Sequence, residues 1–200
     1  MVSPHHSREQ LAIARHSRGE AQFITALEAC PIIRVQSWDV RKGPPVKAEQ
    51  ALGLLWPRSA GEVARGQVSI LCIGPTDWLV LAPDHNRIAL CDELNDTFAR
   101  STYRATDVSD ALARIQVEGD DARALLAKGC SLDLHADRFP PLRSARTRFA
   151  GMPVVIYCAQ TSTFECIVAR SYRDYLLTWL ADAGSEFDIT RAEVTSRLDE

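Results

Sequence analysis

The fold is decided by residues 107–126, which read DVSDALARIQVEGDDARALL. Residues 112–117 alternate Leu, Arg and Gln against Ala, Ile and Val, and a period of two predicts a strand. Residues 120–128 begin with two aspartates and end with a lysine, a charge order that suits the dipole of a short helix. Gly129 follows and is predicted to end that helix.

Strands and helices surround this stretch without the strict alternation of a parallel doubly wound fold. This order predicts an α+β fold with mixed, mostly antiparallel sheets and packed helices. The patterns predict strands at 32–36, 68–72, 78–81, 103–108, 143–149, 154–158 and 164–168, and helices at 46–55, 84–98 and 171–184.

One pattern of hairpin followed by helix occurs twice, at an offset of 86 residues. Cys72 corresponds to Cys158 and Trp78 to Phe164, without a gap. An internal duplication explains this match. A hairpin followed by a helix is also a common unit of unrelated proteins, so the sequence leaves both explanations open.

The last predicted helix has an aromatic stripe at the helical period. We expect Tyr172, Tyr175 and Trp179 to face the core. Ser171 precedes an acid by three residues, the spacing of a capping box. The glycine at position 184 is predicted to end the helix in a left-handed conformation.

Composition limits the classes of protein to consider. The chain has 200 residues, 46% of them hydrophobic, and a net charge of -3, which is typical of globular proteins and unlike nucleic-acid binders. No apolar run approaches the roughly 20 residues of a membrane helix, and no signal peptide is evident, so a cytoplasmic protein is expected. We predict an arm at 1–22, a domain at 23–184 and a charged tail at 185–200.

Candidate catalytic residues are weak. The six cysteines include no C-x-x-C pair, so free buried thiols are expected rather than a metal site or disulfides. Cys130 lies at the predicted C-terminus of a helix, where the dipole opposes a thiolate, and His135 has no evident partner. No glycine-rich phosphate loop occurs. We therefore expect no catalytic, cofactor-binding or metal-binding residue in this chain.

These motifs occur in the order found in a known family. From residue 24 to 184 the chain resembles the glycine-cleavage T-protein superfamily and, more closely, the gamma subunits of heterotetrameric sarcosine oxidase. The residues that carry the resemblance are Gly74, Pro75, Trp78, Asp107, Ser109, Gly119, Ala122, Gly129 and Ser171.

One departure from the superfamily bears on function. In T-proteins a later strand opens with two glycines and carries an acidic pair that serves the folate and amine chemistry. The matching stretch here is residues 150–156, AGMPVVI, which contains no acid. The resemblance therefore implies a T-protein-like fold, related to folate-binding domains, without its catalytic carboxylate.

The resemblance also implies partners. Sarcosine oxidases of this type join alpha, beta, gamma and delta subunits and convert sarcosine to glycine, forming hydrogen peroxide and passing the one-carbon unit to tetrahydrofolate. The family places FAD, FMN, NAD, tetrahydrofolate and zinc in subunits other than gamma. Two alternatives are a gamma-type subunit of an N-methylglutamate dehydrogenase and a stand-alone folate-dependent aminomethyltransferase. Trp38 and Trp56 lie outside amphipathic patterns and are predicted to contact partner subunits.

Overall fold

Two antiparallel sheets form the centre of the molecule. The computed structural model describes residues 10–15, 23–39, 46–187 and 189–194. The five-stranded sheet has the order β4 (Val63–Arg65), β5 (Ser69–Gly74), β6 (Asp77–Leu81), β3 (Ile32–Ser37) and β7 (Tyr103–Asp107). The seven-stranded sheet has the order β12 (Ile189–Val194), β1 (Gln10–Arg15), β2 (Phe23–Ala26), β8 (Leu112–Glu118), β11 (Thr163–Ala169), β10 (Met152–Gln160) and β9 (Arg143–Phe149).

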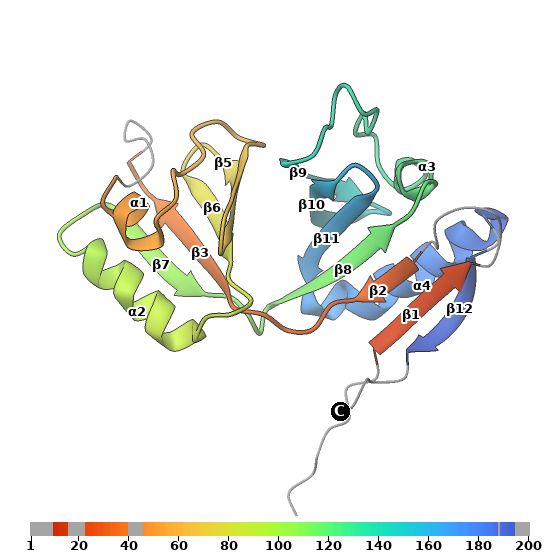
Figure 1. Cartoon of the computed structure of the whole chain (residues 1–200), viewed down its shortest axis with the longest axis horizontal. Helices are drawn as coiled ribbons and strands as arrows, with labels where there is room; N and C mark the ends of the chain where they lie inside the picture. The colour runs from red at the N-terminus through yellow and green to blue at the C-terminus, as the bar shows by residue number, and fades with distance from the viewer. Residues whose placement is uncertain (1–9, 16–22, 40–45, 188, 195–200) are drawn as a thin grey trace, which may run out of the picture.

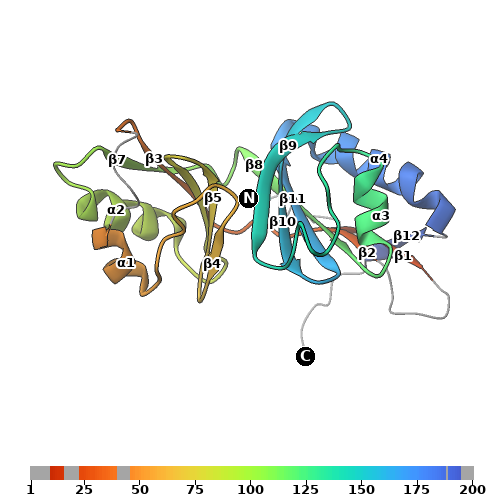
Figure 2. The ribbon, with the colours of Figure 1, turned by 90° about the horizontal axis from the view of Figure 1, so that it is seen from above.

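Helices cover the outer face of each sheet, as Figures 1 and 2 show. Helices α1 (Val46–Leu52) and α2 (Arg87–Thr97) lie on the five-stranded sheet. Helices α3 (Ala122–Ala127) and α4 (Arg173–Gly184) lie on the seven-stranded sheet, and the 3-10 turns η1 (Arg170–Tyr172) and η2 (Ser185–Phe187) flank α4. The predicted α+β class with antiparallel sheets is confirmed.

Each interface between layers has its own apolar cluster. One cluster lies between the seven-stranded sheet and α3 and α4, and a second lies between the five-stranded sheet and its helices. A third joins the two sheets and includes Leu79, Leu81, Tyr157 and Ile167. Strand β11 is buried on both faces, because alternate residues belong to the first and third clusters. The sheets therefore pack face to face.

The two hairpins with matching sequences occupy matching places in the two sheets. Cys72 pairs with Trp78 across the β5–β6 hairpin, and Cys158 pairs with Phe164 across β10–β11. A shift of register follows each cysteine, and each Sγ donates a hydrogen bond to the carbonyl oxygen two residues later. This shared irregularity favours duplication, because a bulge at the same step is not a general property of hairpins.

The core-facing side of α4 differs from the prediction. Leu176, Leu177 and Leu180 are buried, whereas Tyr172 is 41% exposed and Tyr175 is 54% exposed. In α4 the aromatic residues at 175 and 179 are each followed directly by leucine, so the two sets lie on adjoining faces of the helix, and packing buries the leucines. The expectation that the whole aromatic stripe is core is wrong.

Both predicted ends of α4 also differ. Ser171 makes no side-chain cap hydrogen bond, because η1 leads into the helix and Arg173 N donates to the carbonyl of Arg170. The positive φ angles of the described residues do not include Gly184, and the chain continues directly into η2. A continuing 3-10 turn satisfies the terminal carbonyls without a left-handed stop.

The ends of the described chain belong to the seven-stranded sheet. Strand β1 lies in the predicted arm and pairs with β12, which lies in the predicted tail, with Gln10 opposite Val194. Strand β1 also pairs with β2, which joins both to the sheet. The sequence patterns did not predict these two strands, and the sheet extends beyond residues 23–184 on both sides.

Candidate functional site

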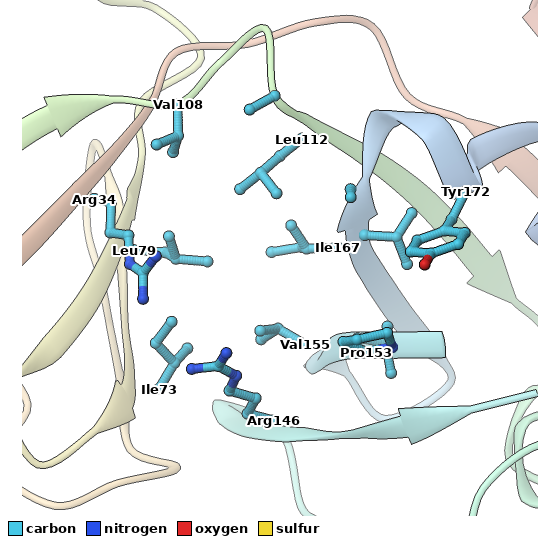
Figure 3. Close-up of a pocket in the computed structure, with 14 residues that line it drawn as sticks. Arg34, Ile73, Leu79, Val108, Leu112, Arg146, Pro153, Val155, Ile167 and Tyr172 are labelled. Carbon is cyan, nitrogen blue, oxygen red and sulfur yellow. The ribbon is translucent and has the colours of Figure 1, made fainter. Parts of the chain in front are cut away.

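A cavity of about 290 Å³ opens between the two sheets. Figure 3 shows its walls, which come from β5, β6 and the β7–β8 turn on one side and from β8, β10 and β11 on the other. Most of the lining side chains are aliphatic, among them Ile73, Leu79, Val108, Leu112 and Ile167. Tyr172 stands at the edge opposite the arginine side chains. The described lining is therefore mainly apolar, with Arg34, Arg146 and Tyr172 as its polar residues.

Strand β10 forms the wall of the cavity where a catalytic acid would be expected from the resemblance to T-proteins. Pro153, Val154 and Val155 line the cavity, and they lie in the stretch 150–156, which the resemblance to T-proteins matches to an acidic pair. Val154 is 2% exposed and Val155 is 7% exposed, so the position is filled by packed aliphatic groups. The lining residues include no carboxylate, imidazole, thiol or lysine. None of the described residues that line the cavity could act as a general base near neutral pH.

Two lining arginines, Arg34 and Arg146, make the charged end of the cavity, and Asp77, which does not line it, is their counter-ion. Arg34 Nε donates to Asp77 Oδ1 at 2.8 Å, and this hydrogen bond raises the pKa of Arg34 above its ordinary value. Arg146 Nη1 lies 3.9 Å from Asp77 Oδ2, and its side chain is 59% exposed. Asp77 is itself 13% exposed; it accepts hydrogen bonds from Arg34 and faces Arg146 only at ion-pair distance. The group as a whole keeps one positive charge.

The candidate nucleophile and base lie outside the cavity. Cys130 is partly buried, and burial raises the pKa of its thiol, which disfavours the reactive thiolate. The exposed His135 lies 3.5 Å from the carboxylate of Asp137, which is also exposed. All six cysteines are free, as predicted, and four of them are buried. Among the residues that the structure describes, no cluster of three His, Cys, Asp or Glu side chains could hold a metal ion.

Asp107 and Ser109 hold the turn between β7 and β8. Asp107 Oδ1 accepts hydrogen bonds from the backbone N and the hydroxyl of Ser109, and Ser109 Oγ accepts from Ile32 N at 2.9 Å. Arg87 Nε lies 3.6 Å from Asp107 Oδ2. Burial alone would raise the pKa of Asp107, but the Ser109 hydrogen bonds and Arg87 lower it overall. These residues therefore fix the turn through which the chain passes from the five-stranded sheet to the seven-stranded sheet.

Gly74, Pro75 and Trp78 form the hairpin between β5 and β6. Trp78 is fully buried and donates from Nε1 to the carbonyl of Pro57 at 2.9 Å. Trp56 stacks edge-on against Trp78, with ring centroids 5.8 Å apart, and is 2% exposed. The prediction that Trp56 contacts a partner is wrong, since its ring completes the core of the five-stranded half.

Trp38, the other predicted contact residue, is 72% exposed at the end of β3. No ring contact of Trp38 with another aromatic residue is found in the described part of the chain. Its exposed indole resembles an interface anchor, and its role remains a prediction.

The remaining signature residues support the chain around α3. Gly119 has a φ of 124°, a conformation that favours glycine, and its N donates to Ser162 O at 3.0 Å. Ala122 is 2% exposed against the core. Arg123, which the sequence reading did not single out, donates to the carbonyls of Leu134 and Phe139 and lies over the Phe164 ring. It fixes the long loop between α3 and β9.

Arg114, like Arg123, is a partly buried arginine that the sequence patterns did not single out. Arg114 Nε donates to Glu165 Oε2 at 2.8 Å, and one Nη donates to Cys30 Sγ at 2.8 Å. The side chain of Arg114 is 13% exposed and that of Glu165 is 11% exposed. In sequence they are 51 positions apart, and only the pairing of β8 with β11 brings them together. This pair is a structural ion pair between neighbouring strands.

Comparison with known proteins decides the family. The model of the sarcosine oxidase, gamma subunit family matches residues 44–186. A sarcosine oxidase subunit gamma from Corynebacterium sp. (strain U-96) is 32% identical over 140 residues, covering 68% of this chain and 67% of that protein. The chain belongs to the sarcosine oxidase gamma subunit family. A gamma subunit from Arthrobacter sp. is 28% identical over 139 residues, with 68% of each chain covered.

Solved structures agree with this assignment to the gamma subunit family. A chain of the heterotetrameric sarcosine oxidase from Corynebacterium sp. U-96, in complex with pyrrole 2-carboxylate, aligns with a TM-score of 0.78 and 26% identity. The alignment covers 90% of this chain and 91% of that one. The glycine cleavage system aminomethyltransferase T from Bartonella henselae aligns with a TM-score of 0.56 and 13% identity over 78% of this chain and 44% of its own. The expected T-protein-like fold is confirmed.

No helix in the described ranges has the length and apolar character needed to cross a membrane.

Proposed function

We propose that this chain is a non-catalytic gamma subunit of a heterotetrameric sarcosine oxidase and that it contributes structure to the assembly. The observation that carries the proposal is the β10 wall of the cavity, where Pro153, Val154 and Val155 stand in the stretch that the resemblance matches to the acidic pair of T-proteins. A T-protein-like site without a base can keep its shape but cannot perform proton transfer. In this role the chain acts through its surfaces and shapes the passage between the oxidation and folate sites.

The proposal assigns alpha, beta and delta subunits as partners in a cytoplasmic complex that demethylates sarcosine. FAD, FMN, NAD, tetrahydrofolate and zinc would then reside in those subunits. Support comes from membership of the gamma subunit family and from a solved heterotetrameric relative that aligns over 90% of this chain. The cavity lining, which is largely aliphatic, offers no alternative reaction centre.

Exposed aromatic side chains are the best candidates for subunit contacts. Trp38, Tyr172 and Tyr175 are 72%, 41% and 54% exposed. Large exposed aromatic residues are enriched at protein interfaces because they bury much area at a small cost in conformational entropy. They lie on different elements, the end of β3 and the start of α4, so they mark two separate contact regions.

Co-purification tests the proposal. An affinity-tagged copy of this chain, co-expressed with the other three subunits, should retain them through size-exclusion chromatography. The purified complex should oxidise sarcosine faster than N-methylglutamate at equal concentrations, and the reverse preference would favour the related dehydrogenase. Titration of the isolated chain with tetrahydrofolate should release no product from an aminomethyl donor. Turnover by the isolated chain would support the stand-alone enzyme and overturn the proposal.

A further inference from the structure

The charged end of the cavity has an arginine whose charge is not neutralised. Arg34 and Asp77 form a two-point pair through Nε and Nη2. Arg146 reaches the same carboxylate only at 3.9 Å, beyond hydrogen-bond range, and Figure 3 shows its guanidinium among the aliphatic side chains. A guanidinium offers five donors in a fixed fork that matches a carboxylate. The fork of Arg146 is therefore available to an anion.

The cavity walls define the rest of the ligand. Ile73, Leu79, Val155 and Ile167 provide apolar surface from both sheets. Ligand pockets in proteins are roughly 300–1,000 Å³, so a cavity of about 290 Å³ accommodates a single ring or a short branched chain. Among the described residues no acid lines the cavity, and Asp77 is already paired with Arg34, so an ammonium group would find no partner.

We propose that this cavity binds a small monocarboxylate that has an apolar body and no amino group, with the carboxylate on Arg146 and the body between the sheets. The class excludes sarcosine and other zwitterionic amino acids, so the site is separate from any site for the amine substrate. The inference does not depend on the proposed function, because it uses only the geometry of this chain.

Benzoate is the probe for the test, since it combines one ring with one carboxylate. Methyl NMR of the full-length chain should show saturable shifts that concentrate on Ile73, Leu79, Val155 and Ile167. Benzyl alcohol has the same ring but no carboxylate, and phenylalanine has the ring and a carboxylate but also an ammonium group. Both should bind at least about tenfold more weakly than benzoate. Equal affinities for the three compounds would contradict the assigned ligand class.

Two arginine variants locate the anion. Arg146→Met keeps the aliphatic stem and removes the fork, and it should weaken benzoate binding by about ten- to a hundredfold. Arg148→Met is the matched control: Arg148 is exposed two residues further along β9 and does not line the cavity. It should change the affinity by less than about twofold. Equal effects of the two substitutions would overturn the assignment of Arg146.

The assembled complex supplies the last discriminating result. Benzoate should shift the same methyl groups when the chain is isotope-labelled and bound to its partner subunits. Loss of benzoate binding on assembly would show that a partner side chain occupies the cavity, and would overturn the proposal of a free ligand. Absence of saturable shifts in the isolated chain would overturn it as well.

Discussion

Gly129 lies directly against the aromatic ring of Phe149. A Cβ added at position 129 would lie 2.6 Å from Cε2 and 2.7 Å from Cε1 of that ring, closer than carbon atoms pack. Phe149 is fully buried and meets Trp179 edge-on, with ring centroids 4.9 Å apart. Gly129 has no positive φ, so its role is close approach rather than the left-handed stop that the sequence suggested. Packing against Phe149 therefore explains why a glycine suits position 129.

Gly129→Ala should therefore destabilise the chain by about 1–3 kcal/mol, the typical cost of overpacking a core. Urea unfolding followed by circular dichroism measures the change. Gly66→Ala is the control, because its added Cβ would meet only Leu54 side-chain atoms at 3.5 Å or more. A Gly129→Ala variant as stable as Gly66→Ala would refute the packing explanation.

Removing one partner of the Arg114–Glu165 pair should lower the free energy of unfolding more than removing both. Glu165→Leu leaves a buried guanidinium without its carboxylate and should cost about 3–5 kcal/mol. The double variant Arg114→Met with Glu165→Leu should recover a large part of this loss, because no uncompensated charge remains. A double-mutant cycle by urea unfolding tests this, and strictly additive losses would show that the two side chains do not interact.

Cys166 should make the chain less stable at alkaline pH. Complete burial raises the pKa of its thiol to about 12 from 9.0. Above pH 9 the unfolded state loses this proton before the folded state does, so stability is full below pH 9 and declines as pH rises towards 12. Between about pH 9 and 10.5, the free energy of unfolding should fall less steeply with rising pH in Cys166→Ala than in Cys91→Ala. Equal slopes would contradict the burial of Cys166.

Trp38 and Trp56 should behave in opposite ways. Trp38→Ser removes an exposed indole, so it should leave the thermal midpoint of the isolated chain within about 2 °C and weaken association with the other subunits. Trp56→Ala should cost about 3–5 kcal/mol, because the indole packs on Trp78 inside the core. Thermal unfolding and co-purification measure both. Unchanged assembly with Trp38→Ser would remove Trp38 from the interface.

The sequence predicts the elements of this fold well where the period is simple. The alternation at 112–117 corresponds to β8, whose Ala113, Ile115 and Val117 all face the core. Prediction fails where two periods overlap, as on α4, and where a single tryptophan has no pattern around it, as for Trp56. It also misses β1 and β12, which pair with each other across 174 to 184 positions of the chain.

The candidate site is less accessible to sequence reasoning than the fold. The absence of an acid in 150–156 is visible in the sequence, but only the structure shows that this strand lines a cavity. Arg34, Asp77 and Arg146 lie on three strands, and only the packing of the two sheets brings Arg146 to the other two. Their chemistry is a property of tertiary structure.

The central claim, that the chain contributes structure rather than chemistry, is tested most directly by omitting it. The other three subunits would be expressed with and without this chain, and the yield of assembled complex and its sarcosine turnover measured together. We predict that omission removes both, and that a chain carrying Tyr172→Phe restores both, because Tyr172, the one phenol among the described residues that line the cavity, performs no proton transfer. A complex that assembles and turns over equally well without this chain would contradict the account.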